Sequence, residues 1–81
     1  MKAVNINLSE AKVKDIQEFV GILAKHHTVD LDLKAGRYTV DARSLIGIFA
    51  LDMAKPIEFI IHSDDEAIVN AILADIKQWI A

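Results

Sequence analysis

Cysteine is absent from this chain of 81 residues, and glycine (three residues), proline (one residue) and aromatic residues (6%) are scarce. Without cysteine the chain can form neither a disulfide nor a thiolate metal site, and this composition is compatible with a reducing cytoplasm. No apolar run approaches the ~18 residues that a membrane-spanning helix needs. The net charge of −3 and the lack of a basic stripe argue against nucleic-acid binding. We therefore expect a cytoplasmic protein with no nucleic-acid or membrane partner.

The length bounds the architecture. Eighty-one residues provide one domain, which we expect to span residues 1–81. The hydrophobic content of 53% excludes a disordered chain. A domain of this size buries roughly 60–65% of its unfolded surface, so we expect modest stability and no deep pocket. The first residues lead directly into a strand pattern rather than into a secretory signal.

Alternation of apolar and polar residues predicts four strands. The first covers residues 2–8. The second, Val29–Leu33, and the third, Tyr38–Val40, form a hairpin around a tight turn in which Gly36 is free to adopt a positive φ. The fourth covers Ile57–Ile61 and begins directly after the single proline, a position at which a strand tolerates this residue.

Helical spacing predicts three helices between and after these strands. The first begins with Ser9 as N-cap and continues to about Lys25. The second is the short apolar segment 43–53. A capping box of Ser63 (N-cap) and Glu66 (N3) opens the third helix, which we expect to continue to the last residue.

The resulting order, β-α-β-β-α-β-α, predicts an α+β fold. Because the strands are apolar on one side only, we expect an open-faced sandwich, in which three helices cover one face of a four-stranded antiparallel sheet. Ferredoxin-like modules share the order of the first six elements, which leaves a small-molecule-binding regulatory domain as an alternative. The lack of a glycine-rich loop at the first strand–helix turn disfavours that alternative.

The segment 43–53, RSLIGIFALDM, has more apolar side chains than a short helix can bury on one side. One stripe of the predicted helix contains Ser44, Gly47, Ile48 and Leu51. The other stripe contains Leu45, Ile46, Phe49 and Met53. Only one stripe can pack on the sheet, so we predict that the second one, with Phe49 at its centre, docks a protein partner or a second copy of the chain. The alternative is that neighbouring loops shield part of this stripe and that the rest are ordinary, scattered surface residues.

Three segments of the chain resemble HPr, the histidine-containing phosphocarrier of the bacterial sugar phosphotransferase system. The most similar segment is VDARSLIGIFAL (Val40–Leu51), with its serine and glycine in a short apolar helix. Ile57–Leu73 resembles the strand, capping box and helix that end the family's fold, and Phe19–Leu33 resembles its first helix and second strand. The resemblance covers most of the chain and implies the HPr-like version of the open-faced sandwich.

The family's active site is the part of the pattern that this chain lacks. In the family, a loop of glycine, isoleucine or leucine, histidine, alanine, arginine, proline and alanine opens the first helix, and its histidine accepts a phosphoryl group. Counting back without gaps from Phe19 places Lys12 at the histidine position, Lys14 at the arginine position and Asp15 at the proline position. A lysine side chain, with a reference pKa of about 10.4, has no free lone pair at neutral pH. Lys12 and Lys14 therefore mark a degenerate active site, and we interpret both as ordinary solvated lysines, with anion binding as the alternative.

The remaining polar candidates are three histidines and one serine. His26, His27 and His62 lack a helix N-terminus and metal-like spacing, so we assign them structural or surface roles and expect neither a metal nor a cofactor. Ser44 begins the short apolar helix beside Arg43. In the resembling family, the serine at this place is phosphorylated by a dedicated kinase in Gram-positive bacteria, and a helix N-terminus favours a phosphate electrostatically. We favour a simple N-cap role for Ser44, with regulatory phosphorylation as the alternative.

These observations predict an HPr-like protein that is not an enzyme and lacks a phosphoacceptor. Its expected role is regulatory: it occupies a component of the phosphotransferase system, or pairs with itself, through the short apolar helix. One alternative is a phosphocarrier of the same system that uses a non-standard site. Acid-labile phosphate on any histidine would establish that alternative. The other alternative is the small-molecule-binding regulatory domain described above.

Overall fold

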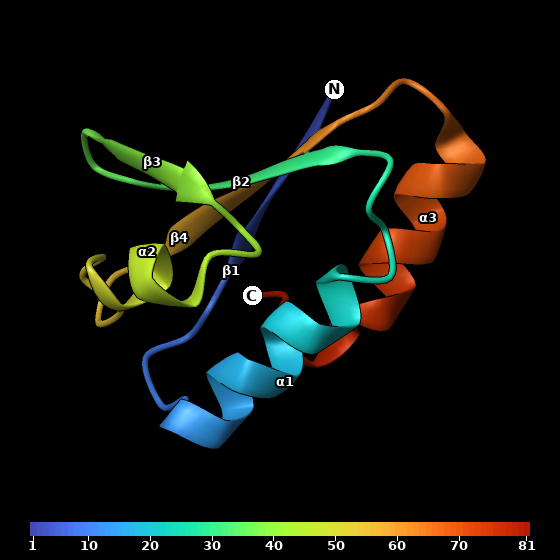
Figure 1. Cartoon of the computed structure of the whole chain (residues 1–81). Coiled ribbons are helices and arrows are strands. Elements are labelled where there is room, and N and C mark those ends of the chain that lie inside the picture. Colours follow the sequence, from blue (N-terminus) through green and yellow to red (C-terminus); the bar gives the residue numbers. More distant parts are fainter.

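The computed structural model describes all residues from 1 to 81, and its elements follow one another in the predicted order (Figure 1). The strands are β1 (Lys2–Ile6), β2 (Asp30–Ala35), β3 (Tyr38–Asp41) and β4 (Ile57–His62). The helices are α1 (Val13–Leu23), α2 (Leu45–Phe49) and α3 (Glu66–Asp75), followed by the 3-10 helix η1 (Lys77–Trp79). None of these helices is long and apolar enough to cross a membrane.

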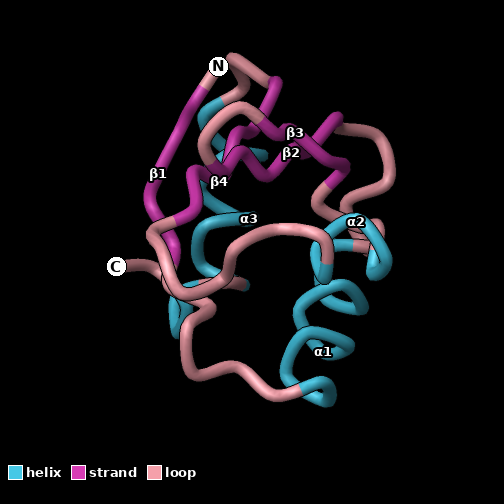
Figure 2. Tube along the Cα trace, turned by 90° about the vertical axis from the view of Figure 1, so that its left-hand side faces the viewer, coloured by secondary structure: helices cyan, strands magenta, loops and turns pink.

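The strands form one antiparallel sheet in the order β1-β4-β2-β3. On the apolar face, Phe59 of β4 lies opposite Val4 of β1 on one side and Leu33 of β2 on the other. On the other face, Glu58 lies opposite Asn5 and Lys34, and Ile60 lies between Ala3 and Asp32, so this face is mostly polar. All three helices lie on the apolar side of the sheet (Figure 2). The predicted α+β open-faced sandwich is thereby confirmed.

The core lies between the sheet and the helices and contains no polar or charged residue. Phe19 of α1 occupies its centre. Its ring packs edge-to-face against Phe59, with 6.2 Å between the ring centroids, and against Trp79, with 5.1 Å between the centroids. Each such pair contributes about 0.5–1.5 kcal/mol beyond the burial of its area. Ile57 and Ile61 of β4 are fully buried beside them, as period-two alternation requires.

The turn between β2 and β3 agrees with the prediction. Ala35 lies opposite Tyr38, which leaves the two-residue loop Gly36–Arg37 between the strands. Gly36 has a φ of 60°, a backbone conformation that a side chain disfavours. Glycine at the first central position of a two-residue loop matches the twist of the strands that the loop joins.

The predicted beginning of the first helix is wrong. Ser9 does not cap α1, because Oδ1 of Asn7 accepts hydrogen bonds from its backbone N–H (2.8 Å) and its hydroxyl (2.6 Å). The N-cap is Lys12, whose backbone N–H donates to the carboxylate of Asp15 at 2.8 Å. The strand before it ends at Ile6 rather than at residue 8, and α1 itself ends at Leu23, two residues earlier than predicted.

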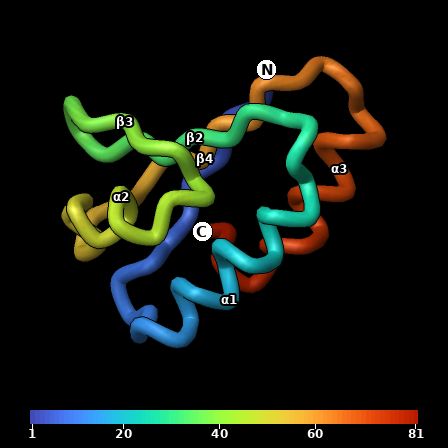
Figure 3. The backbone as a smooth tube through the Cα atoms, viewed as in Figure 1, coloured from blue at the N-terminus to red at the C-terminus, as the bar shows by residue number.

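The last helix also differs from the prediction at both ends. Its N-cap is Asp65 rather than Ser63, since Asp65 accepts from the N–H groups of the first turn. It ends at Asp75 instead of continuing to the last residue. Beyond η1 the chain returns beside β1 (Figure 3), where Ile80 forms an antiparallel bridge with Ile6. Helical spacing does not reveal this pairing, because its backbone hydrogen bonds join Trp79 and Ala81 to residues more than seventy positions earlier in the chain.

A candidate docking surface around helix α2

Helix α2 covers only five residues and is therefore shorter than the predicted helical segment 43–53. Ser44 is its N-cap, and the Oγ of Ser44 accepts a hydrogen bond from the N–H of Gly47 at 3.1 Å. A Cβ on Gly47 would lie 3.1 Å from Cβ of Val40 on β3. Glycine at this position therefore allows α2 to lie close against the edge of the sheet.

The two predicted stripes of α2 have different environments. Ile48 is fully buried and Leu51, just after the helix, is nearly so. On the outer side, the exposed fraction is 85% for Ile46 and 41% for Phe49. The other two predicted docking residues are partly buried and pack against the core; they are Leu45 and Met53. We refer to Leu45, Ile46, Phe49 and Met53 together as the α2 patch, of which Ile46 and Phe49 form the exposed part.

Further exposed apolar side chains lie on the elements that adjoin α2. Helix α2 packs beside α1 and β3. Val13 at the start of α1 is 58% exposed, and Tyr38 at the start of β3 is 66% exposed. Helical periodicity places Val13 and Gln17 on one uncharged flank of α1, whereas Asp15 and Glu18 lie on the opposite flank. Of the large apolar side chains that are exposed, Ile46, Phe49, Val13 and Tyr38 therefore lie on α2 or on the elements that adjoin it, whereas Met1 and Ile80 lie elsewhere.

A shallow depression adjoins the α2 patch on the side of the hairpin turn. We call it the hairpin depression. Its lining includes Arg37, Tyr38, Ala50, Asp52, Lys55 and Pro56. The depression lies between the start of β3 and the segment that follows α2. The sequence analysis did not predict this depression, because it depends on how the β2–β3 turn lies against residues 50–56. The only signal in the sequence was Tyr38, an aromatic residue directly after Arg37 of the turn.

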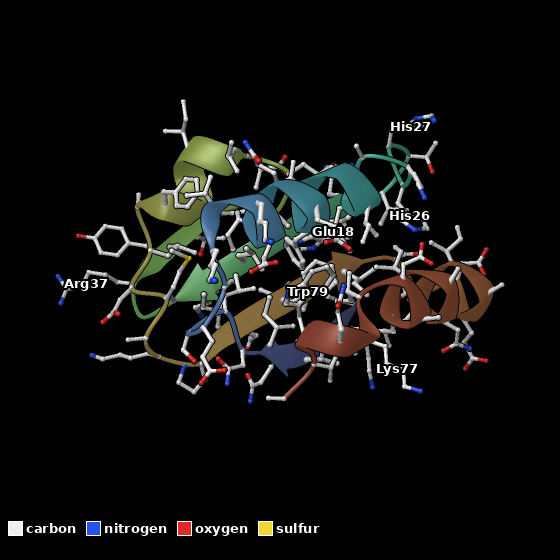
Figure 4. The ribbon with its side chains drawn as sticks, turned by 90° about the horizontal axis from the view of Figure 1, so that it is seen from below. Glu18, His26, His27, Arg37, Lys77 and Trp79 are labelled. Carbon is white, nitrogen blue, oxygen red and sulfur yellow. The ribbon has the colours of Figure 1, made fainter.

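The two lysines that the sequence comparison with HPr predicted to mark a degenerate active site lie elsewhere, at the start of α1. Lys12 and Lys14 are both exposed and neither forms a salt bridge. The nearest concave feature is a groove between the start of α1 and the C-terminal segment. Its lining includes Glu10, Ala11, Asp15, Glu18, Trp79 and Ile80, and no lysine or arginine. Figure 4 shows Glu18 and Trp79 on the two sides of this groove. A phosphate entering it would meet carboxylates rather than cations.

The histidines are held by carboxylates or exposed. His26 Nε2 lies 2.7 Å from Oδ2 of Asp75, and His62 Nε2 lies 2.8 Å from Oδ2 of Asp32. His27 is exposed at the end of the molecule that is opposite α2 (Figure 4). None of the three lies at a helix N-terminus. Nowhere do three histidine, aspartate or glutamate side chains gather in a way that could hold a metal ion.

Comparisons with known proteins identify no relative of this chain. No protein-family model matches the chain, and no curated protein matches it.

Proposed function

We propose that this chain is a non-catalytic, HPr-like docking module that binds a protein component of the phosphotransferase system through the α2 patch and carries no phosphate. The observation that supports this most directly is the exposure of Ile46 and Phe49 on a helix that buries Ile48 completely on its other side. Contiguous exposed apolar area usually marks a binding surface, and a phenylalanine among aliphatic residues is a typical interface anchor.

The groove at the start of α1 supports the second half of the proposal. A phosphoryl carrier needs a nucleophile with a free lone pair and groups that stabilise the anion. Here Lys12 is the N-cap of α1, and the groove beside it is lined by Glu10, Asp15 and Glu18. Those carboxylates repel a phosphoryl donor. A homologue with this groove can occupy a partner's docking site while it accepts nothing from that partner.

Such a protein acts as a competitor. It binds a partner that would otherwise bind the functional carrier, and it lowers the flux of phosphoryl groups in proportion to its concentration and affinity. The uncharged flank of α1, with Val13 and Gln17, extends the docking face beyond α2. Partners that recognise two adjacent helices would therefore find both on one side of this molecule.

A reconstituted phosphoryl-transfer reaction tests the proposal. The purified first enzyme of the phosphotransferase system is incubated with phosphoenolpyruvate and a functional HPr, with and without an excess of this chain. We expect no acid-labile phosphate on this chain and slower phosphorylation of HPr. The Phe49→Asp variant should lose this inhibition. Ala67→Asp, which adds the same charge at an exposed position of α3, should retain it.

Two results would contradict the proposal. Acid-labile phosphate on any histidine of this chain would make it a carrier rather than a competitor. Inhibition that survives in Phe49→Asp would place the binding surface away from the α2 patch.

A further inference from the structure

The hairpin depression lies between the β2–β3 turn and the segment that follows α2. Tyr38 is two-thirds exposed in its lining, and Ala50, which follows Phe49 directly, lines the same depression. An aromatic ring, a proline and the end of α2 therefore border one concave surface. Tyrosine, phenylalanine and arginine are the residue types enriched at the centres of protein interfaces.

Two of the three charged side chains that line the depression are cationic, Arg37 and Lys55, and the third is Asp52. Arg37 forms no salt bridge. Lys55 is well exposed and its Nζ lies 3.9 Å from Oδ2 of Asp52, a distance that gives a weak surface ion pair. The other oxygen of Asp52 accepts a hydrogen bond from the N–H of Ala54. In a chain with a net charge of −3, these two cations border the apolar surface, whereas Glu18 lies on the far flank of α1.

We propose that the hairpin depression is part of the docking surface and that the partner segment it receives is acidic. An apolar side chain of the partner covers Tyr38 and Pro56, while its carboxylates approach Arg37 and Lys55. Opposite charges at the rim of an interface increase the rate of encounter and fix the orientation of the partner. This inference rests on the proposed function, because it takes the α2 patch as the neighbouring half of the same interface.

Two synthetic amphipathic peptides provide the test. They share one face of leucine and phenylalanine, and differ only in having glutamate or lysine on the other face. Each is titrated into the isotope-labelled chain while the amide NMR signals are followed. We expect the glutamate peptide to shift the amides of residues 36–38 and 50–55, with an affinity that falls as salt is added. The lysine peptide should leave these amides unshifted.

Single variants locate the charges. Arg37→Gln and Lys55→Gln should each weaken binding of the glutamate peptide by about two- to fivefold, the range for one exposed ion pair. Lys77→Gln is the matched control, because Lys77 lies on η1, away from Arg37 (Figure 4), and should change nothing. Equal binding of the lysine peptide, shifts confined to other surfaces, or affinities unchanged in both glutamine variants would overturn the inference.

The two proposals fail in different ways. If the glutamate peptide binds the depression but the chain does not inhibit phosphorylation of HPr, the depression is an acidic-peptide site and the proposed function is wrong. If the chain inhibits through Phe49 and that inhibition is unaffected by Arg37→Gln and Lys55→Gln, the docking role stands and the acidic partner is wrong.

Discussion

Arg43 donates a hydrogen bond from Nη1 to the main-chain oxygen of His26, 3.0 Å away. His26 in turn places Nε2 within 2.7 Å of the Asp75 carboxylate at the end of α3. Arg43 immediately precedes Ser44, the N-cap of α2, and His26 follows the end of α1. These two hydrogen bonds therefore connect the start of α2, the end of α1 and the end of α3 through polar side chains that lie outside the core. They fix the start of α2, a helix too short to hold its own position.

Replacing Arg43 with alanine should lower the free energy of unfolding by roughly 1–2 kcal/mol, because a charged donor to a partly buried carbonyl is lost. Urea unfolding followed by circular dichroism measures the change. Arg37→Ala is the matched control, since Arg37 is exposed and unpaired, and should shift the stability by no more than about 0.5 kcal/mol. Equal losses in the two variants would show that the Arg43–His26 bond contributes nothing.

The glycines of two helices should respond in opposite ways to alanine. Gly21 on α1 faces open space, so Gly21→Ala should raise the free energy of unfolding by roughly 0.5–1 kcal/mol through helix propensity. At Gly47 the new Cβ would lie 3.1 Å from both Val40 Cβ and Ser44 Oγ, so Gly47→Ala should instead lower it by roughly 1–2 kcal/mol. Thermal unfolding compares the pair; stabilisation by both would mean that α2 can move away from β3 at little cost.

The sheet was predictable because its signal is local and redundant. Ile57, Phe59 and Ile61 are fully buried on one face of β4. A one-residue slip of the register would expose all three at once. The glycine turn was predictable for a similar reason, since only one residue near it accepts a positive φ freely. Both inferences use residues whose burial or conformation is decided within a few positions of the chain.

The helix ends were less predictable, because several polar residues compete for the same cap. Ser9 is a good N-cap by type, but Asn7 engages it in a local turn. Ser63 and Asp65 both suit the start of α3, and Asp65 takes the position. At the candidate site, the exposure of Ile46 and Phe49 followed from helical spacing. The hairpin depression did not, because it is formed by the β2–β3 turn and by residues that follow α2.

As the N-cap of α2, Ser44 should contribute about 1 kcal/mol to the free energy of unfolding. Ser44→Ala removes the acceptor of the Gly47 N–H and should lower the free energy of unfolding by that amount. Ser9→Ala is informative as a comparison, because Ser9 caps no helix in this structure and should cost less than about 0.5 kcal/mol. Denaturant unfolding of both variants distinguishes the roles. A larger loss for Ser9→Ala would restore Ser9 as the cap of α1, as the sequence alone suggested.

Aspartate substitutions on the two sides of α2 test which side is free. Phe49→Asp should keep the fold and lower the free energy of unfolding by about 1–2 kcal/mol, because the ring is already 41% exposed. Ile48→Asp puts a charge into the core and should cost several kcal/mol, enough to unfold a domain of ordinary stability. Circular dichroism and amide NMR spectra report both outcomes. If Phe49→Asp unfolds the chain while Ile48→Asp is tolerated, α2 is rotated about its axis and the docking surface loses its anchor.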